Sequence, residues 1–216
     1  MVQQWRGTEV RSREAVLRAS VALALCVLLF GGVVGAAEQT AKATFAGGCF
    51  WCMQPAYDAV PGVISTNVGY TGGQKKDPSY HEVGSGTTGH AESIEVVYDP
   101  KKVSYEKLLE VFWRNVDPTD ANGQFCDKGN QYRSAIFYHD DAQKRLAEQS
   151  KKDVAKALKV PGPIVTEIVP ASTFYSAEEY HQSYYKKNPL RYRFYRRGCG
   201  RDNRLEEVWG AAPAGH

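Results

Sequence analysis

The chain has 216 residues, 43% of them hydrophobic, and a formal net charge of +3. Four arginines and two glutamates precede residue 38, so the rest of the chain carries a net charge of about +1. A near-neutral body lacks the concentrated basic face that nucleic-acid binding requires, and we expect no nucleic-acid partner. The length is that of one ordinary domain that buries a core of its own.

The N-terminus predicts an export signal. Arginines precede an uncharged run at 21–37, which ends in the small residues Gly-Ala-Ala. A basic region, an apolar region and a small-residue cleavage site are typical of a signal peptide. We therefore predict a signal peptide at 1–37, a folded domain at 38–216 and a periplasmic location. The alternative is an inner-membrane anchor at 21–37, because this run is at the lower limit of length for a bilayer span.

Short apolar runs and turn residues predict the regular structure in chain order. Strands are expected at 42–47, 63–70, 90–98, 134–138 and 164–169. Helices are expected at 49–59, 104–113, 140–158 and 177–187. Glycine-rich or polar composition predicts long loops at 71–89 and 117–131. Because the strands and helices are interspersed without strict alternation, we predict a two-layer α+β sandwich with a mixed β-sheet.

The most informative stretch is 46–53, Ala-Gly-Gly-Cys-Phe-Trp-Cys-Met. It predicts a strand, a glycine turn and then Cys49 at the N-terminus of a helix. The free N–H groups of a helix N-terminus stabilise a thiolate, so we expect the pKa of the Cys49 thiol to be lowered. The thiolate is the reactive form of cysteine, which makes Cys49 the candidate nucleophile. A buried structural cysteine beside core aromatics is the alternative interpretation.

Four cysteines follow the predicted signal peptide: Cys49, Cys52, Cys126 and Cys199. An even number of cysteines in an exported domain can form structural disulfides, but a domain with a full core does not need them, so we expect free thiols. The spacing Cys49-x-x-Cys52 suits a dithiol oxidoreductase, half of a zinc site, or a nucleophile with a helper thiol. Cys126 and Cys199 each lack a partner at ligand spacing, and we predict no metal site.

Several blocks of the sequence, in a fixed order, resemble the A-type peptide methionine sulfoxide reductases. The blocks lie at 48–51 (Gly-Cys-Phe-Trp), 69–73 (Gly-Tyr-Thr-Gly-Gly), 80–92, 117–136 and 178–189. The resemblance covers roughly residues 44–209. It implies the ferredoxin-like core of that family in a catalytic domain at 38–216. It also implies an oxidoreductase that reduces methionine S-sulfoxide, free or in proteins, and so repairs oxidised proteins under oxidative stress.

The resemblance also implies which side chains act on the sulfoxide oxygen. Cys49 attacks the sulfur, while the carboxylic acid of Glu92 and the phenols of Tyr80 and Tyr132 protonate or hydrogen-bond the oxygen as charge develops there. Glu92 donates a proton at neutral pH only if its pKa is raised. An apolar, aromatic-walled pocket raises it by desolvating the anion.

Three further residues are assigned to substrate binding. Phe50 and Trp51 flank the nucleophile and are expected to hold the S-methyl group of the substrate between two aromatic faces. Burial of one methyl contributes only about 1 kcal/mol, so this cleft orients the substrate more than it anchors it. Asp127 resembles a loop aspartate of the family that organises the pocket through hydrogen bonds.

The attack leaves Cys49 as a sulfenic acid, which a second thiol must convert to a disulfide. Cys199 is our first choice, because it lies between glycines in a tail that resembles the mobile segment of the family. Cys52, one helical turn from Cys49, is second, and it departs from the glycine that the family often has there. Cys126 is third.

The resemblance implies a thioredoxin-like or other dithiol reductant, with oxidised peptides and proteins as substrates. We expect no bound cofactor and a monomer. The main alternative is a general thiol–disulfide oxidoreductase that uses Cys49 and Cys52. A second alternative is a redox-inert binding module whose four cysteines form structural disulfides.

Overall fold

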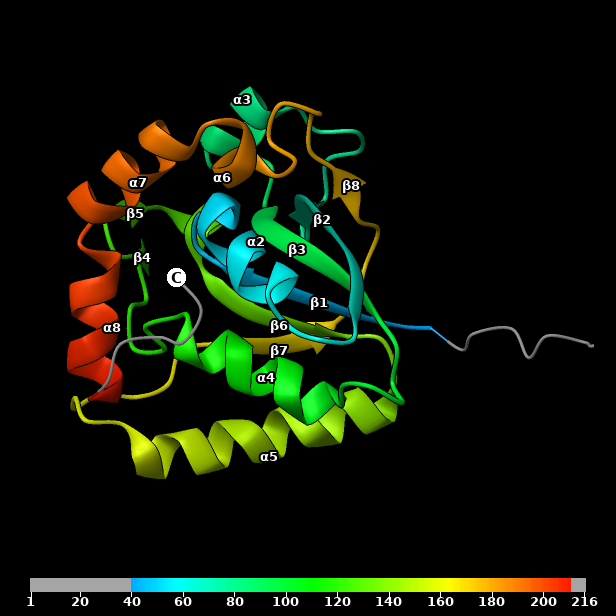
Figure 1. Cartoon of the computed structure of the whole chain (residues 1–216), viewed down its shortest axis with the longest axis vertical. Helices are drawn as coiled ribbons and strands as arrows, with labels where there is room; N and C mark the ends of the chain where they lie inside the picture. The colour runs from blue at the N-terminus through cyan, green and yellow to red at the C-terminus, as the bar shows by residue number, and fades with distance from the viewer. Residues whose placement is uncertain (1–39, 211–216) are drawn as a thin grey trace, which may run out of the picture. The chain divides into compact units, whose positions relative to one another are not determined.

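The computed structural model describes residues 40–210 (Figure 1). The predicted signal peptide or anchor at 1–37 lies outside these residues, so the export signal and the location stay predictions. Among the residues that the structure describes, no helix has the length and apolarity needed to cross a membrane.

A six-stranded sheet forms the centre of the fold, in the order β7-β6-β1-β3-β2-β8 (Figure 1). The strands are β1 Ala41–Gly47, β2 Val63–Thr71, β3 Ala91–Tyr98, β6 Ser134–Tyr138, β7 Glu167–Pro170 and β8 Tyr175–Ser176. All neighbours pair antiparallel except β6 and β7, which are parallel. The predicted α+β fold with a mixed sheet is therefore confirmed.

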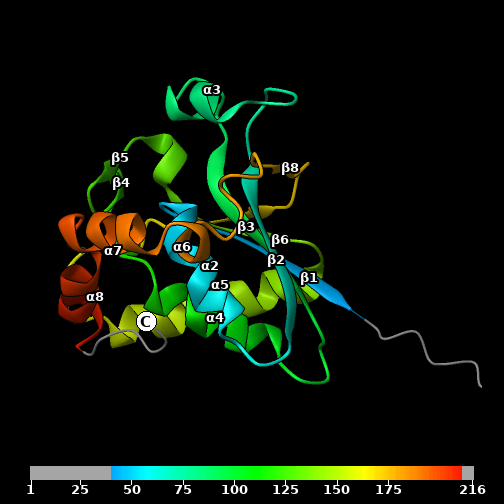
Figure 2. The same cartoon turned by 45° about the horizontal axis from the view of Figure 1, so that its top comes forward.

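The helices pack on this sheet and along its edges (Figures 1 and 2). They are α2 Phe50–Asp58, α3 Tyr80–Gly84, α4 Tyr105–Arg114, α5 Asp141–Ala157, α6 Tyr184–Lys187, α7 Pro189–Gly198 and α8 Arg201–Trp209. A small hairpin, β4 Gly123–Gln124 and β5 Asp127–Lys128, precedes a 3-10 turn at Asn130–Tyr132. Helix α2 lies against β2 and β3, and α4 lies beside α5.

The core is formed by apolar side chains that recur at the spacing of the predicted helices and strands. In α4, Leu108, Leu109 and Phe112 recur at helical spacing and are all fully buried. The Ser104 side chain begins this helix by accepting the Lys107 N–H at 3.3 Å. Burial of each such apolar side chain stabilises the fold by roughly 1.5–3 kcal/mol. The predicted boundaries of this helix, 104–113, are correct to within one residue.

Three predictions of secondary structure, for two loops and one helix, are wrong. The loop expected at 71–89 contains α3, because Ser79 and Glu82 form a reciprocal pair of helix-capping hydrogen bonds. The loop expected at 117–131 contains the β4–β5 hairpin and the 3-10 turn. The helix expected at 177–187 is reduced to α6, since hydrogen-bonded turns occupy 179–183.

The segment 189–209, which the sequence analysis expects to carry a mobile tail, has regular structure. It forms helices α7 and α8, which the sequence analysis does not predict. Helix α8 buries Leu205 and Val208 completely, so the tail is part of the core. Gly200, with φ of 68°, makes the turn between the two helices, a conformation that favours glycine.

Candidate active site

Two glycines place Cys49 at the start of α2. Gly48 has φ of 76°, and a Cβ built on it would lie 2.5 Å from the Cβ of Gln124. A Cβ on Gly47 would lie 2.6 Å from the sulfur of Met53. No side chain fits at either position, and the backbone turns sharply from β1 into α2. Cys49 is consequently the N-cap residue of α2, as predicted.

Cys49 and Cys52 are free thiols, and both are buried. Burial, followed by the interaction with the Cys52 thiol and the charges of Glu92 and Asp127, raises the pKa of Cys49. The hydrogen bond from Cys49 lowers the pKa of Cys52 to about 7, against the effect of burial. Two coupled thiols lose their protons in two steps, so the pair carries one negative charge near neutral pH, and that charge is favoured on Cys52.

The expected lowering of the Cys49 pKa by the helix N-terminus is therefore wrong for the resting site. The reason is visible in the first N–H group of α2. The Phe50 N–H donates to Oε2 of Glu92 at 3.0 Å and is not free to stabilise the Cys49 thiolate. Desolvation of the buried thiol then dominates.

Glu92 is the second residue of β3, and its side chain is buried. Burial raises its pKa to about 8, although the hydrogen bond from the Phe50 N–H opposes the rise. The negative charges of Asp127 and Cys52 add to the rise. The carboxyl group is consequently protonated at neutral pH, and the predicted rise of its pKa is confirmed.

The structure brings the two predicted phenols into the same site. Tyr80 is the first residue of α3, and Tyr132 ends the 3-10 turn. Burial and then the charge of Glu92 raise both pKa values, that of Tyr80 to about 12. The charge of Cys49 also acts on both phenols. Both hydroxyl groups therefore stay protonated and can donate hydrogen bonds.

The two aromatic residues after Cys49 have different surroundings. Phe50 is buried, with its ring 5.1 Å from the ring of His181. Trp51 is half-buried and stacks on Tyr184 at 3.8 Å. The ring of Tyr195 meets Trp51 edge-on at 5.9 Å. Of these two residues, Trp51 and not Phe50 therefore offers part of its aromatic surface to solvent beside Cys49.

His181 and Tyr195 belong to this site, although the sequence analysis assigns them no role. His181 is fully buried, and its Nδ1 accepts the indole N–H of Trp51 at 2.9 Å. Burial lowers the pKa of His181, so the ring is neutral. The hydroxyl of Tyr195 donates to Oδ2 of Asp127 at 2.5 Å. The sequence block at 178–189 could have indicated His181, but nothing in the tail indicates Tyr195.

Cys126 and Cys199 form a disulfide. The expectation that all four cysteines are free thiols is therefore wrong for this pair, because the fold brings the hairpin corner against the turn between α7 and α8. Neither residue offers a thiolate to a zinc site. Cys199 also has no thiol to offer a sulfenic acid, so its role as the resolving cysteine stays a prediction that requires this disulfide to open first.

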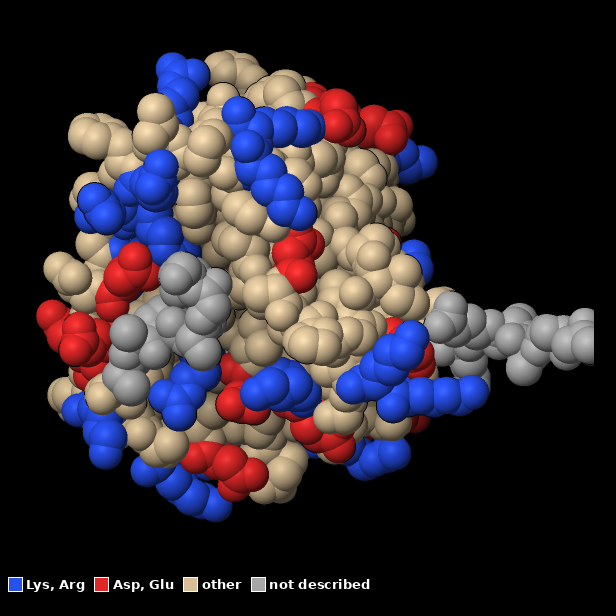
Figure 3. Space-filling model, viewed as in Figure 1, with Lys and Arg blue, Asp and Glu red and all other residues tan. Residues whose placement is uncertain are grey.

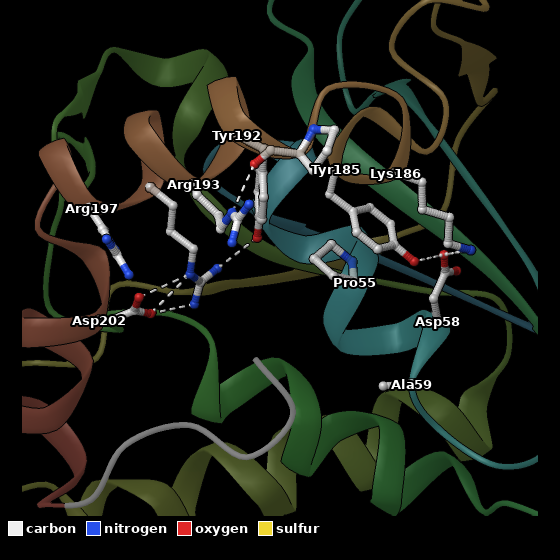
Figure 4. A pocket seen from close by; sticks show the side chains of 11 residues that line it. Pro55, Asp58, Ala59, Tyr185, Lys186, Tyr192, Arg193, Arg197 and Asp202 are labelled. Atoms are coloured by element: carbon white, nitrogen blue, oxygen red, sulfur yellow. Dashed lines mark hydrogen bonds and ion pairs between the residues drawn. The ribbon is translucent and has the colours of Figure 1, made fainter.

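A cavity of about 660 Å³ lies beside the C-terminal half of α2, away from Glu92. Tyr185, Tyr192, Lys186 and Asp202 are among its lining residues, and Figure 4 shows them around Pro55. Basic and acidic side chains are interspersed on the surface around this face of the molecule (Figure 3).

Comparisons with known proteins match the whole described region. The family model described as peptide methionine sulfoxide reductase matches residues 41–213. The chain is 53% identical to peptide methionine sulfoxide reductase MsrA of Bacillus subtilis, over 81% of this chain and 98% of the relative. It is also 53% identical to MsrA 2 of Caulobacter vibrioides, over 88% of this chain and 95% of the relative.

Two solved structures have the same fold. Reduced Mxr1 of Saccharomyces cerevisiae matches with a TM-score of 0.66 and 38% identity, covering 71% of this chain and 88% of the other. Methionine sulfoxide reductase A of Corynebacterium diphtheriae matches with a TM-score of 0.63 and 36% identity, covering 72% of this chain and 78% of the other. These likenesses, joined to the site described above, show that the chain belongs to the A-type peptide methionine sulfoxide reductases.

Proposed function

We propose that this enzyme reduces methionine S-sulfoxide, free or in proteins, with Cys49 as the nucleophile and Glu92 as the acid. The observation that carries the proposal is the position of Glu92. Its carboxyl group is bound to the N–H of Phe50, the residue after the nucleophile, and burial keeps it protonated at neutral pH. Sulfoxide reduction requires a proton donor for the departing oxygen, whereas thiol–disulfide exchange has no oxygen to protonate.

The first step joins sulfur to sulfur and moves the oxygen. Cys49 attacks the sulfoxide sulfur, its thiol proton passing to the Cys52 thiolate or to water, while Glu92 gives its proton to the oxygen. The oxygen then passes to Cys49, which becomes a sulfenic acid, and the substrate leaves as methionine. Cys49 is oxidised and the sulfoxide is reduced by the same two electrons. The phenols of Tyr80 and Tyr132 stabilise the developing charge by donating hydrogen bonds.

The site favours one sulfoxide epimer. The S-methyl group is oriented against the face of Trp51, and the oxygen points to Glu92. In the opposite epimer the methyl group and the oxygen exchange places, so its oxygen has no proton donor. Such a site accepts one epimer only, and the family resemblance implies that this is the S-epimer.

Cys52 resolves the sulfenic acid in this proposal. It is a free thiol that lies one helical turn from Cys49, and its pKa of about 7 makes the thiolate available near neutral pH. Its thiolate attacks the Cys49 sulfur, a disulfide forms, and the oxygen leaves as water after taking up a proton. Cys199, our first choice from sequence, is already bonded to Cys126.

A thioredoxin-like protein or another dithiol then reduces the Cys49–Cys52 disulfide. We further propose that the chain is exported by the signal peptide at 1–37, or held at the inner membrane by 21–37. It acts there as a monomer on proteins damaged by oxidation.

The test is an assay of both sulfoxide epimers of a blocked methionine with dithiothreitol as the reductant. We expect the S-epimer to be reduced and the R-epimer to remain, with no reduction by Cys49→Ser. Reduction of insulin disulfides without reduction of either sulfoxide would instead favour the general thiol–disulfide oxidoreductase.

A further inference from the structure

A buried arginine contacts both ends of the segment that carries Cys49 and Cys52. Arg201 is the first residue of α8, and only 1% of it is exposed. Its Nη2 donates to the carbonyl oxygen of Gly47 at 3.0 Å and lies 3.1 Å from the sulfur of Met53. The same nitrogen donates to the carbonyl of Asn115, at the end of α4, at 2.6 Å. The guanidinium group is thereby fixed beneath the turn between β1 and α2.

The charge of this guanidinium acts on the Asp127 carboxylate and opposes the rise of its pKa by burial, but the two groups form no ion pair. Within residues 40–210, no carboxylate pairs with Arg201, and its Nε and Nη1 have no hydrogen-bond partner. Arg196 on α7 makes the contrast plain, because its Nε lies 3.0 Å from the carboxylate of Asp202. A buried cation without an anion is costly, so an anionic partner for Arg201 is expected nearby.

The thiol of Cys52 is the group that fits this requirement. Its segment is the one that Arg201 holds, since Met53 follows Cys52 directly. The positive charge of Arg201 also lowers the pKa of Cys52, and it does so more strongly than that of Arg196.

The other ionisable groups that act on Cys52 do not replace this partner. On α2, Cys49 donates the hydrogen bond that lowers the pKa of Cys52 most. On β5, the charge of Asp127 raises the pKa of Cys52. The charge of Cys52 in turn raises the pKa values of Glu92 on β3 and of Tyr192 and Tyr195 on α7. The two arginines are therefore the cations of this environment, and Arg201 is the one without a carboxylate of its own.

We propose that Arg201 is a positioning residue that holds Cys52 as a thiolate, both when Cys52 attacks the oxidised Cys49 and when Cys52 leaves it again. This inference rests on the proposed function. In the first event the Cys52 thiolate forms the disulfide and water is released. In the second, a thiolate of the reductant attacks the Cys49 sulfur, the disulfide breaks, and Cys52 departs with the electron pair. A leaving thiol with a lower pKa departs faster, so the arginine directs the reductant to Cys49.

A stacking contact links this arginine to the segment that carries one end of the Cys126–Cys199 disulfide. The guanidinium carbon of Arg201 lies 4.5 Å from the ring centre of Phe125. Phe125 precedes Cys126, and Arg201 follows Cys199 by two residues. The disulfide therefore fastens together the two segments that hold Arg201 in place.

The test is a thiolate titration of the full chain with the Cys126–Cys199 disulfide intact. In a Cys26→Ser/Cys49→Ser background, Cys52 is the one cysteine outside the Cys126–Cys199 disulfide, and its thiolate is followed by ultraviolet absorbance against pH. Arg201→Gln removes the charge but keeps N–H donors for the Gly47 and Asn115 carbonyls. We expect this variant to raise the titration midpoint, with the ratio of thiolate to thiol at pH 7 falling about tenfold for each unit.

Two variants separate charge from structure. Arg201→Lys keeps the charge and should keep the midpoint close to that of the parent. Arg204→Gln is the matched control on the same helix, because Arg204 is paired with Asp117 at 2.7 Å, and it should leave the midpoint unchanged. If Arg201→Gln fails to fold, as judged by near-ultraviolet circular dichroism, Arg201→Met provides the second neutral variant.

An unchanged midpoint in a folded neutral variant would overturn the inference, and so would an equal rise in the lysine variant. The titration does not depend on sulfoxide reduction. A raised midpoint in an enzyme that reduces neither epimer would reject the proposed function and keep the role of Arg201. Normal sulfoxide reduction with an unchanged midpoint would do the reverse.

Discussion

The two cysteine pairs of this protein have opposite fates. Cys49 and Cys52 are three residues apart and buried, yet they remain free thiols. Cys126 and Cys199 are separated by 73 residues in sequence, and they form a disulfide, with Cys126 exposed. The spacing that looks most suited to a bond is thus the one left open, and the distant pair is closed.

The closed pair supports the open one. The disulfide joins the hairpin corner at β4–β5 to the turn between α7 and α8. The hydrogen bond from Tyr195 to Asp127 joins the same two segments beside the site. In the proposed function, the Cys49 and Cys52 pair carries out the chemistry, while the Cys126–Cys199 disulfide holds together two segments beside the site. If the roles of the two pairs were the reverse, substitutions would have the opposite effects. Four sets of substitutions test this assignment.

Cys49→Ser is expected to have the largest effect. Serine is a far weaker nucleophile than a thiolate, so methionine formation from the S-sulfoxide should fall to the background rate. The measurement is methionine released per enzyme, with dithiothreitol in excess. Measurable catalytic turnover by this variant would remove Cys49 from the role of nucleophile.

Cys52→Ser should have the next largest effect on activity. It leaves the first step intact, but it stops recycling through the disulfide. With a thioredoxin-type reductant, we expect about one methionine per enzyme and then a stall. The matched control is the double variant Cys126→Ser/Cys199→Ser, which should continue to cycle. If the double variant stalls and Cys52→Ser cycles, the resolving role passes to Cys199 or Cys126, and the single variants of these two decide between them.

Glu92→Gln should slow the first step by about 10²- to 10⁴-fold, the range typical of a lost general acid. Because the pKa of Glu92 is raised to about 8, the acid is protonated below that pH and loses its proton above it. The wild-type rate of a single turnover should therefore fall as the pH rises through about 8. This fall in rate should be absent in the variant. If the rate of the variant still falls near pH 8, the proton is lost from a group other than Glu92.

Removal of the Cys126–Cys199 disulfide should have the smallest effect on the chemistry and a clear effect on stability. A cross-link across 73 residues stabilises the folded chain by roughly 4 kcal/mol in the chain-entropy model. Urea unfolding of Cys126→Ser/Cys199→Ser should show a loss of this order. An unchanged stability with a loss of turnover would mean that this pair acts in the reaction.

The segments that the sequence predicts well carry their own local signals. The turn into α2 follows from Gly47, Gly48 and Cys49, and α4 from Ser104 and its apolar periodicity. Both depend on interactions within a few residues, so a single sequence contains what is needed. Cys49 is indicated as the candidate nucleophile for the same reason.

The tail could not be predicted because its structure depends on distant contacts. Helix α7 exposes Leu190 and Phe194, so its sequence lacks a clear apolar face. The site shows the same limit. Glu92 was found only through a family resemblance, and Arg201 gave no signal, since its role comes from Gly47 and Asn115, far away in the chain. The disulfide likewise depends on which loops the fold brings together.

The most direct test of the account is a disulfide map after a single turnover. The enzyme, with Cys49 and Cys52 reduced, is mixed with one equivalent of methionine S-sulfoxide without any reductant and analysed by peptide mass spectrometry. We predict one methionine per enzyme, a new Cys49–Cys52 disulfide, and an intact Cys126–Cys199 disulfide. A Cys49–Cys199 bond with Cys126 set free, or methionine without any bond at Cys49, would contradict it.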